Sequence, residues 1–341
     1  MSDKKQIVAV VGPTASGKSG LAMKIAAKYN GTIVCCDSMQ IYRGMDIGTA
    51  KPTAEDMRTV PHRLFDIVEP RSSYSCADYA SAARTAIGEI SVAGSMPVFC
   101  GGTGLYLDSL LMPRSYSQTS GITAVRAELE AIAAKPNGKE LLHAMLAEID
   151  PESAENIHPN NVRRTIRAIE IYRESGVPKS VLDRRSRDNA GESEYDALVI
   201  GLRYPDRSIL RARIARRVDE MLECGLEAEV RRLMALGVFD PLPDGTPATA
   251  AQAIGYKEML AAVQESPTLT ETSRASVRDT IITATCRYAK RQMTWFGAKP
   301  YVRWIDITSD GYDPAPQAYK MLDEFLKNRN KNGRGAEWHD G

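Results

Sequence analysis

The segment Gly12–Ser19, GPTASGKS, constrains this chain more than any other part of it. It fits the pattern G-x-x-x-x-G-K-[ST], follows the apolar run Ile7–Val11 and precedes a helical pattern that begins at Leu21. A strand, a glycine-rich loop and a helix start together form an anion site, because loop amides and the helix N-terminus direct positive charge at phosphate oxygens. Lys18 adds a full charge, and the Ser19 hydroxyl can bind Mg²⁺. The segment therefore predicts binding of a diphosphate or polyphosphate, without specifying ATP.

The length and composition of the chain set further limits. A chain of 341 residues fits two domains, or one domain with a large insertion. Its 44 basic and 43 acidic side chains nearly cancel, so only local clustering can indicate a nucleic-acid partner. The six cysteines form no C-x-x-C pair, which indicates reduced thiols rather than a disulfide framework or zinc site. No signal-type segment and no apolar run of roughly 20 residues is present, so we expect a cytoplasmic protein without a membrane partner.

A second apolar run, Thr32–Cys36, follows the first helical pattern and ends at Asp37. This spacing predicts a β-α-β unit with a parallel sheet, whose ligands lie beyond the carboxyl ends of the strands. We therefore expect Asp37 and the phosphate loop to face one cleft. The stretch Asp37–Pro52 is long and aperiodic, which is typical of a functional loop, although its Arg43-Gly44 tip fits a solvated turn equally well.

The buried strand predicted at Pro97–Cys100 ends in Gly101-Gly102-Thr103. The glycines allow a ligand to approach the backbone closely. Thr103 fits either a helix-capping threonine or a catalytic hydroxyl at the same sheet edge as Asp37. A typical P-loop ATPase has an aspartate at such a strand end, whereas here Asp37 is the only strand-end carboxylate.

Helical patterns replace strands after a Pro-, Ser- and Arg-bearing stretch at 112–120, and an apolar run returns at Tyr195–Leu202. We therefore predict an α/β protein: a P-loop NTPase-like parallel sheet core with an inserted all-helical subdomain. The expected boundaries are 1–115 and 195–325 for the two parts of the core, 116–194 for the insertion and 326–341 for a flexible tail.

Basic side chains gather in three places. Arg163, Arg164 and Arg167 share one face of a predicted helix, where a solvated surface is the plain alternative. Six arginines between 203 and 217 accompany a single aspartate, which favours a polyanionic partner. A third cluster, at 287–291, precedes two aromatic residues, a combination that suits single-stranded RNA but also occurs on ordinary surface helices.

Eight segments carry a family resemblance: GPTASGKS, DSMQIYRGMDIGTAKP, PHRLFDI, GGTGLYLDSLL, IHPNNVRRTIRAIE, RVDEMLECGLEAEV, QAIGYKE and YAKRQMTWF. In this order they resemble tRNA dimethylallyltransferases of the bacterial type, also called tRNA isopentenyltransferases or IPP transferases. The resemblance spans about Ile7 to Trp304. It implies transfer of a dimethylallyl group from dimethylallyl diphosphate to N6 of the adenosine 3′ of the anticodon. It also implies an insertion that helps to clasp the anticodon stem-loop. We further expect Mg²⁺ as cofactor and a monomer.

The resemblance also assigns roles to residues. Asp37 is similar to the family's general base and Thr103 to its active-site threonine. The diphosphate would be held by Gly12, Thr14, Ala15, Ser16, Gly17, Lys18, Ser19 and Arg217, with Ser19 also on the metal. The tRNA would be contacted by Asp37, Ser38, Met39, Gln40, Arg163, Arg164, Arg167, Gln252, Gly255, Lys257, Lys290, Arg291 and Gln292.

The chain departs from the family pattern in places. Cys286 and Arg287 stand where family members commonly have arginine and glutamine, which leaves their contacts open, and Asn161 replaces an aspartate, so the local helix cap can differ. Three alternatives remain: an adenylate isopentenyltransferase that uses free AMP, ADP or ATP, a P-loop nucleotide kinase or ATPase, and a noncatalytic RNA-binding module. The insertion with its arginines argues against the first. The Gly-Gly strand end argues against the second, and the complete phosphate loop beside Asp37 against the third.

Overall fold

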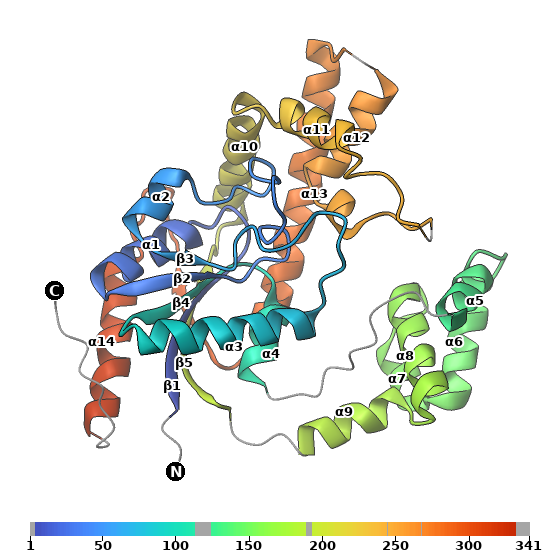
Figure 1. Ribbon diagram of the computed structural model, residues 1–341, viewed down its shortest axis with the longest axis horizontal. Helices are drawn as coiled ribbons and strands as arrows, with labels where there is room; N and C mark the ends of the chain where they lie inside the picture. Colours follow the sequence, from blue (N-terminus) through green and yellow to red (C-terminus); the bar gives the residue numbers. More distant parts are fainter. Residues whose placement is uncertain (1–3, 113–123, 189–192, 244, 267, 332–341) are drawn as a thin grey trace. The chain divides into compact units, whose positions relative to one another are not determined.

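The strands form one six-stranded parallel sheet (Figure 1). The computed structural model describes residues 4–112, 124–188, 193–243, 245–266 and 268–331. The strand order in this part is β3-β2-β4-β1-β5-β6. Every pairing is parallel. The strands are β1 (Lys5–Val11), β2 (Gly31–Cys35), β3 (His62–Arg63), β4 (Met96–Cys100), β5 (Tyr195–Arg203) and β6 (Val302–Asp306).

Helices cover both faces of the sheet, as a parallel sheet requires. On one face α1 (Lys18–Lys28) and α14 (Ala315–Lys331) pack on apolar side chains of β1, β4 and β5. On the other face α3 (Cys76–Val92) and α4 (Gly104–Leu111) pack on the alternate residues of the same strands. Two interior strands, β2 and β4, are therefore buried along their whole length. The predicted α/β fold with a parallel, P-loop-like sheet is confirmed.

A third apolar layer forms around the segment 37–52, which leaves the end of β2. This segment packs against α10 (Arg207–Glu223), α11 (Leu226–Ala235), α12 (Tyr256–Glu265) and α13 (Glu271–Gly297). Its side chains Ile41, Tyr42 and Met45 are at most 1% exposed. The short elements α2 (Ala54–Thr59) and η1 (Thr249–Gln252) lie in the connections. The long loop is therefore part of a core, and its shape is fixed by burial.

The segment Met112–Glu192 forms a compact unit of its own, which we call unit 2; Met1–Leu111 and Ser193–Gly341 form unit 1. Unit 2 contains α5 (Ala124–Ala133), α6 (Gly138–Ile149), α7 (Pro151–Asn156), α8 (Val162–Ser175) and α9 (Lys179–Asp188). Leu129, Leu142 and Leu146 are fully buried in its apolar core. The division points lie close to the boundaries expected at 115/116 and 194/195.

Polar segments depart most from the sequence-based expectations. Residues 326–331, expected in a flexible tail, belong to α14; residues 332–341 lie outside the described part. The polar residues 183–188 belong to α9, and the stretch 61–70 pairs with the sheet at His62–Arg63. These segments lack a clear apolar period, so their structure depends on neighbours that the sequence does not reveal. None of the described helices is long and apolar enough to cross a membrane.

Candidate active site

The phosphate loop lies between β1 and α1 in a conformation that its glycines permit. Gly12 and Gly17 have φ of 146° and 88°. A Cβ on Gly12 would lie 2.9 Å from the carbonyl oxygen of Leu202, so no other residue fits there without a shift. Lys18 is only 8% exposed, and its Nζ is 3.4 Å from the carbonyl oxygen of Pro13. The loop thus places a buried cation beneath a set of backbone amides.

Three side chains from other elements hold the tip of the loop. Gln292 Oε1 accepts a hydrogen bond of 2.8 Å from the amide of Thr14, and the same side chain donates through Nε2 to the carbonyl of Gly102 at 3.0 Å. Arg213 Nε donates to the carbonyl of Ala15 at 2.9 Å. Tyr204 Oη donates to the carbonyl of Ser16 at 2.9 Å. The loop is therefore fixed before any ligand binds, which reduces the reorganisation that binding requires.

Asp37 follows the end of β2 and lines a cavity of about 230 Å³, which we call the active-site cavity. Thr14 of the phosphate loop and Arg217 of α10 line the same cavity. One carboxylate oxygen of Asp37 accepts the backbone N–H of Met39 at 2.9 Å, so its orientation is set by its own turn. The remaining walls are Ser38, Met39, Gly48, Thr49, Ile214, Val218, Met221, Gln252, Ala253, Ile254, Ile281, Thr285, Tyr288 and Arg291. The cleft expected between Asp37 and the phosphate loop is present.

The electrostatics of this cavity favour an anion. Burial lowers the pKa of Lys18, and the positive charge of Arg217 lowers it further. Burial also lowers the pKa of Arg217, while the carboxylate of Asp37 acts in the opposite direction. Two buried like charges near one carboxylate leave a net attraction for negative charge. A diphosphate would relieve that repulsion.

Tyr288 is a site residue to which the sequence analysis assigned no role. It lines the active-site cavity from α13. Burial raises its pKa, the charge of Asp37 raises it further, and hydrogen bonding with Thr103 and Gln292 opposes the shift. Thr285 lies one turn earlier on the same face and also lines the cavity, but this helical spacing alone fits a core position equally well. Tyr288, with its hydroxyl kept neutral, thus shares the cavity with Asp37 and Thr14.

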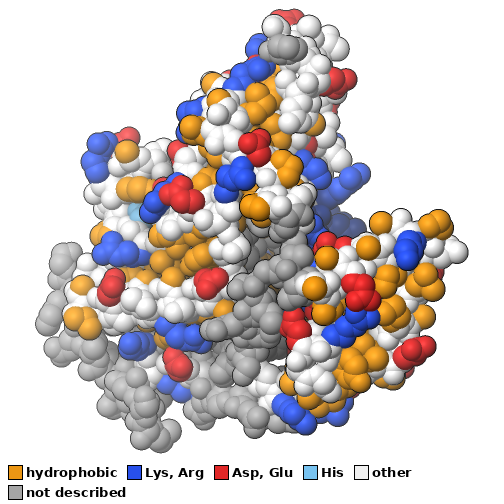
Figure 2. Space-filling model, turned by 45° about the vertical axis from the view of Figure 1, so that its right-hand side comes forward, with side chains coloured by type: hydrophobic (Ala, Val, Ile, Leu, Met, Phe, Trp, Pro, Cys, Tyr) orange, Lys and Arg blue, Asp and Glu red, His pale blue; other side chains and the backbone are white. Residues whose placement is uncertain are grey.

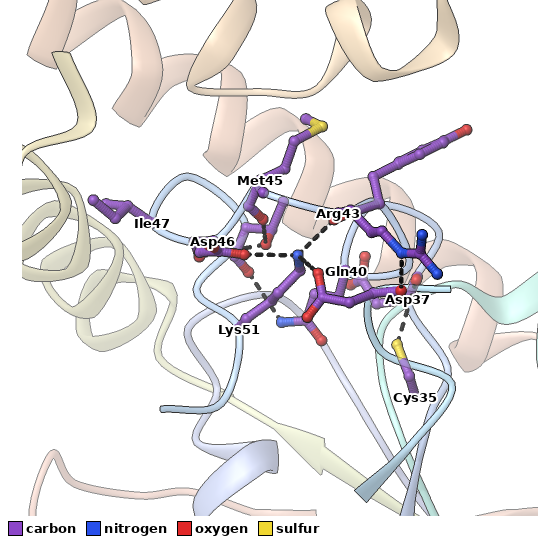
Figure 3. A network of polar contacts seen from close by, with 12 residues as sticks. Cys35, Asp37, Gln40, Arg43, Met45, Asp46, Ile47 and Lys51 are labelled. Carbon is purple, nitrogen blue, oxygen red and sulfur yellow. Dashed lines mark hydrogen bonds and ion pairs between the residues drawn. The ribbon is translucent and has the colours of Figure 1, made fainter. Parts of the chain in front are cut away.

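The segment 37–52 is held in place by a network of polar contacts (Figure 3). Lys51, whose side chain is 3% exposed, donates to the carbonyl of Tyr42 at 2.5 Å and forms ion pairs with Asp46 and Asp66. Gln40 donates through Nε2 to the carbonyls of Thr49 and Ala50, at 3.0 Å each. The network therefore fixes the part of the loop that forms one wall of the active-site cavity.

A second set of contacts, from α11 and α12, also holds the segment 37–52. The carboxylate of Glu229, on α11, accepts the backbone amides of Asp46, Ile47 and Gly48 at 3.0–3.2 Å. It also accepts the hydroxyl of Tyr256 at 2.5 Å, and that hydroxyl accepts the amide of Gly48 at 3.1 Å. Glu229 is 6% exposed. A buried anion with these donors is satisfied by hydrogen bonds rather than by a cation.

Thr103 lies behind the cavity wall. Its Oγ1 accepts the amide of Ser38 at 2.9 Å and donates to the Ser38 hydroxyl at 3.3 Å. Thr103 is absent from the lining, whereas Ser38 belongs to it. The catalytic role predicted for Thr103 stays a prediction; the contacts show that it fixes the turn that carries Asp37.

The two glycines before Thr103 make close contacts with the protein itself. A Cβ on Gly101 would lie 2.0 Å from the carbonyl oxygen of Cys36, and one on Gly102 would lie 1.9 Å from Gln292 Nε2. We expected these glycines to admit a ligand. In the structure, Gly101 instead lets the backbone of Cys36 approach closely, and Gly102 does the same for the side chain of Gln292, which holds the phosphate loop.

The residues predicted to contact tRNA are found in different environments. Gln252 and Arg291 line the active-site cavity, together with Ser38 and Met39. Lys290 lines a neighbouring cavity, Lys257 is exposed, and Gly255 caps α12 with φ of 94°. The side-chain amides of Gln40 and Gln292 are engaged inside unit 1. Their tRNA contacts stay predictions.

The predicted basic face of unit 2 is partly exposed. Arg163 and Arg164 are exposed on α8 and form no ion pair within the part of the chain that the structure describes. Arg167 pairs with the buried Glu170 at 3.4 Å. Asn161 precedes α8 without a side-chain capping hydrogen bond, as the replaced aspartate led us to expect.

Distant carboxylates compensate three of the six arginines at 203–217. Arg203 makes a two-pronged contact with Asp306 at 2.7 and 3.0 Å. Arg213 and Arg216 share Asp310, whose pKa they lower to about 2 through hydrogen bonds. The inference that these arginines lack partners was therefore wrong for three of them, because the carboxylates are about one hundred residues away in sequence. Arg207, Arg211 and Arg217 form no described ion pair.

The site suits Mg²⁺ only if phosphate oxygens supply most of its ligands. No group of three His, Cys, Asp or Glu side chains in the described residues is placed to hold a metal. The Ser19 hydroxyl is exposed at the start of α1, beside the Cys100 thiol at 3.9 Å. Mg²⁺ commonly binds one or two protein oxygens, substrate phosphates and water. Ser19 fits that pattern.

Comparison with known proteins decides the family. A sequence model described as IPP transferase matches residues 40–299. The chain belongs to the IPP transferase family. A second model, described as isopentenyl transferase, matches residues 5–68 of this IPP transferase. The family predicted from the motifs is thereby confirmed.

Similar proteins extend over nearly the whole IPP transferase chain. The tRNA dimethylallyltransferase of Carboxydothermus hydrogenoformans is 44% identical over 306 residues, which cover 90% of this chain and 93% of the relative. That of Bacillus subtilis is 43% identical over 305 residues, covering 89% and 92%. The crystal structure of a tRNA isopentenylpyrophosphate transferase from Bacillus halodurans is 38% identical with a TM-score of 0.68, covering 97% of this chain and all of that one. A eukaryotic dimethylallyltransferase structure, 24% identical with a TM-score of 0.76 and coverage of 98% and 82%, shares the fold.

Proposed function

We propose that this IPP transferase transfers the dimethylallyl group of dimethylallyl diphosphate to N6 of the adenosine 3′ of the anticodon in tRNA. The products are N6-(dimethylallyl)adenosine and diphosphate. The observation that carries the proposal is that Asp37 shares one cavity with Thr14 of the phosphate loop and with Arg217. A proton acceptor is thus placed opposite an anion site, as the reaction requires. The family and the curated relatives support the same reaction.

The anion side of the cavity suits the leaving diphosphate. Loop amides, Lys18 and Arg217 would stabilise the charge that develops as the allylic carbon–oxygen bond breaks. Such preorganised donors are each worth about 10²–10³ in rate. Bound Mg²⁺ would supply further charge neutralisation, with Ser19 among its ligands. The cavity therefore favours a departing polyanion over water activation against a terminal phosphate.

The opposite side of the cavity suits the nucleophile. The exocyclic amine of adenosine is a weak nucleophile because its lone pair is delocalised. Asp37 would orient this amine and accept one N6 proton as the nitrogen–carbon bond forms. The adenine must leave its stack to reach this depth, at a cost of a few kcal/mol that an RNA loop makes smaller. Tyr288 would restrict the amine's position.

Other parts of the proposal concern the surroundings of the site. We propose that tRNA contacts Gln252, Lys257 and Arg291 on unit 1. We further propose that Arg163 and Arg164 of unit 2 bind the stem backbone, because both are exposed and uncompensated. The protein would act as a monomer in the cytoplasm.

The test is a transfer assay with radiolabelled dimethylallyl diphosphate, Mg²⁺ and two acceptors in parallel: an anticodon stem-loop and AMP. The informative variant is Asp37→Asn, because asparagine keeps the oxygen that accepts the Met39 amide and loses the basic oxygen. Asp37→Ala, which loses both, is the matched comparison. We expect Asp37→Asn to lower kcat by about 10²–10⁴ without lowering the melting temperature.

Each outcome has a defined meaning. Label in the stem-loop alone, lost in both variants, supports the proposal. Label in AMP alone assigns the chain to the adenylate isopentenyltransferases. ATP turnover without prenyl transfer would leave only the kinase alternative. Retained transfer by Asp37→Asn would exclude Asp37 as the base.

A further inference from the structure

A second cavity lies beside the active-site cavity, and Lys290 is the one lining residue to which the sequence analysis assigned a role. Its volume is about 730 Å³, within the range of small-ligand sites. Ile214 of α10 lines both cavities, and the neighbouring loop residues Pro13 and Thr14 line one each. We call it the α10–α13 cavity, because those helices supply most of its wall.

Helix α13 separates the two cavities. Thr285, Tyr288 and Arg291 face the active-site cavity. Residues Cys286, Ala289, Lys290, Met293 and Thr294 face the α10–α13 cavity. With 3.6 residues per turn these sets lie on different sides of the helix. A ligand in one cavity would therefore be separated from a ligand in the other by about the width of one helix.

The α10–α13 cavity combines an apolar floor with a basic rim. Pro13, Leu210 and Met293 contribute to the floor, with Tyr204, Pro205, Ile214 and Ala289. Arg207 and Arg211 on α10 and Lys290 on α13 form the rim, and all three are exposed.

The carboxylates near this rim are engaged with other groups and do not neutralise its cations. Arg203 and Asp306, which also line the cavity, neutralise each other. Asp206 accepts the amide of Ser208 at 2.8 Å as the cap of α10. Within the described part of the chain, the charged side-chain groups of Arg207, Arg211 and Lys290 form no hydrogen bond or ion pair. The cavity thus offers an apolar surface below three free cations.

A basic ridge connects the two cavities. Arg287, Lys290 and Arg291 are exposed on the side of α13 that lies between the cavity-lining faces. Figure 2 shows a group of basic side chains beside the upper helical part of unit 1. A phosphate backbone that crosses this ridge would pass directly from one cavity to the other.

We propose that the α10–α13 cavity holds an RNA nucleotide adjacent to the modified adenosine, with its base on the apolar floor and its phosphates on the basic rim. This proposal rests on the proposed function. Flipping the adenosine out of its stack leaves a neighbouring base without a stacking partner, and an apolar surface can replace that partner. The rim cations are spread over two helices and stay hydrated, as in backbone tracking; a small phosphorylated ligand would favour convergent, buried donors. A nucleotide of the loop fits both features.

The test combines changes in the protein with changes in the RNA. Stem-loops that carry an abasic residue on the 5′ or the 3′ side of the target adenosine serve as substrates. With the unchanged protein, one of these substitutions raises KM for the stem-loop about tenfold. With Met293→Ala, which truncates the floor, the same abasic substitution has a much smaller effect, because the lost base contact is already weakened.

The rim is tested by the double variant Arg207→Ala/Arg211→Ala. We expect a KM for the stem-loop raised about tenfold, with kcat and the KM for dimethylallyl diphosphate unchanged. The slope of log KM against log salt falls by about 1.4, since each lost phosphate contact contributes about 0.7 for single strands. The matched control is Arg58→Ala/Arg63→Ala, which removes two exposed charges from α2 and β3 and leaves KM for the stem-loop unchanged.

Two results would overturn the proposal. Abasic penalties that are equal with and without Met293→Ala would show that no base contacts the floor. A raised KM for dimethylallyl diphosphate in the rim variant, without a change for RNA, would assign the cavity to a small anion. The absence of transfer to any stem-loop by the unchanged protein is a different failure, because it removes the proposed function itself.

Discussion

Replacing Glu229 with glutamine tests whether the active-site cavity depends on a buried carboxylate that never touches substrate. Glu229 accepts the amides of residues 46–48 and the hydroxyl of Tyr256. Gly48 and Thr49 line the cavity, and the carbonyl of Thr49 accepts Arg217 at 3.3 Å. Glu229 therefore holds the segment that contains Gly48 and Thr49, and this segment in turn orients Arg217.

The expected magnitude follows from these contacts. Glutamine keeps one acceptor oxygen and turns an NH₂ group toward the amide of Asp46, which then loses its acceptor. A hydrogen bond to a charged group contributes about 1.5–3 kcal/mol, and a buried unsatisfied N–H costs about 1–3 kcal/mol. Relief from burying a charge offsets part of this loss. We expect Glu229→Gln to reduce the free energy of unfolding of unit 1 by about 3 kcal/mol.

The assay uses urea unfolding followed by tryptophan fluorescence. Trp295 and Trp304, the tryptophans of the described residues, both lie in unit 1, so the signal reports on the unit that contains Glu229. Units 1 and 2 can unfold separately, and a single global transition is not required. We also expect the KM for dimethylallyl diphosphate to rise about tenfold, equivalent to about 1.4 kcal/mol.

The matched control is Glu227→Gln on the same helix. Glu227 pairs with Arg231 and Arg274 near the surface, at 3.0 Å each, and such pairs contribute about 0–1 kcal/mol. A reduction of the free energy of unfolding by less than about 1 kcal/mol for Glu229→Gln, or by an equal amount in both variants, would refute the argument. An unchanged KM with a large loss of stability would restrict Glu229 to folding alone.

Further predictions concern the charges, the loop contacts and the thiols. Arg217→Gln should raise the KM for dimethylallyl diphosphate about 10–100-fold without destabilising the ligand-free protein, because it removes a buried like charge near Lys18; a lower melting temperature would contradict this. The pKa of Lys18 is lowered in the folded state. Between this lowered pKa and the ordinary lysine value, the unfolded state therefore binds more protons than the folded state. Stability relative to Lys18→Met should therefore increase over that range in urea titrations. Gln292→Met should lower kcat about tenfold, while RNA affinity in a filter-binding assay should stay constant. A loss of RNA affinity would show that Gln292 contacts RNA. A thiol reagent should label the exposed Cys224 first and Cys36 only on unfolding, since burial raises the pKa of Cys36 to about 12; mass spectrometry of the labelled peptides checks the order.

The phosphate loop and Asp37 could be predicted from the sequence because their signals are local. The loop motif lies between a strand and a helix, and Asp37 follows the next strand directly. Parallel strands end at one edge, so both residues had to meet there. Tyr288 had no such signal, since its place on an amphipathic helix fits a core residue equally well.

The charged residues show the opposite case. Arg203, Arg213 and Arg216 looked uncompensated within their own stretch, yet Asp306 and Asp310 neutralise them. Whether an arginine is free for a polyanion depends on which carboxylates folding brings near. No pattern within one segment contains that information.

The sequence by itself determined the parallel α/β core, the inserted helical unit, the phosphate loop and the family, because these follow from motifs and periodicities between near neighbours. Only the tertiary structure decided which side chains hold the site in shape. Glu229 lies more than 180 residues from the backbone amides it accepts, and Gln292 lies 278 residues from Thr14. The physical reason is that hydrogen bonding and burial act through space, and the fold alone sets the distances between segments far apart in the chain.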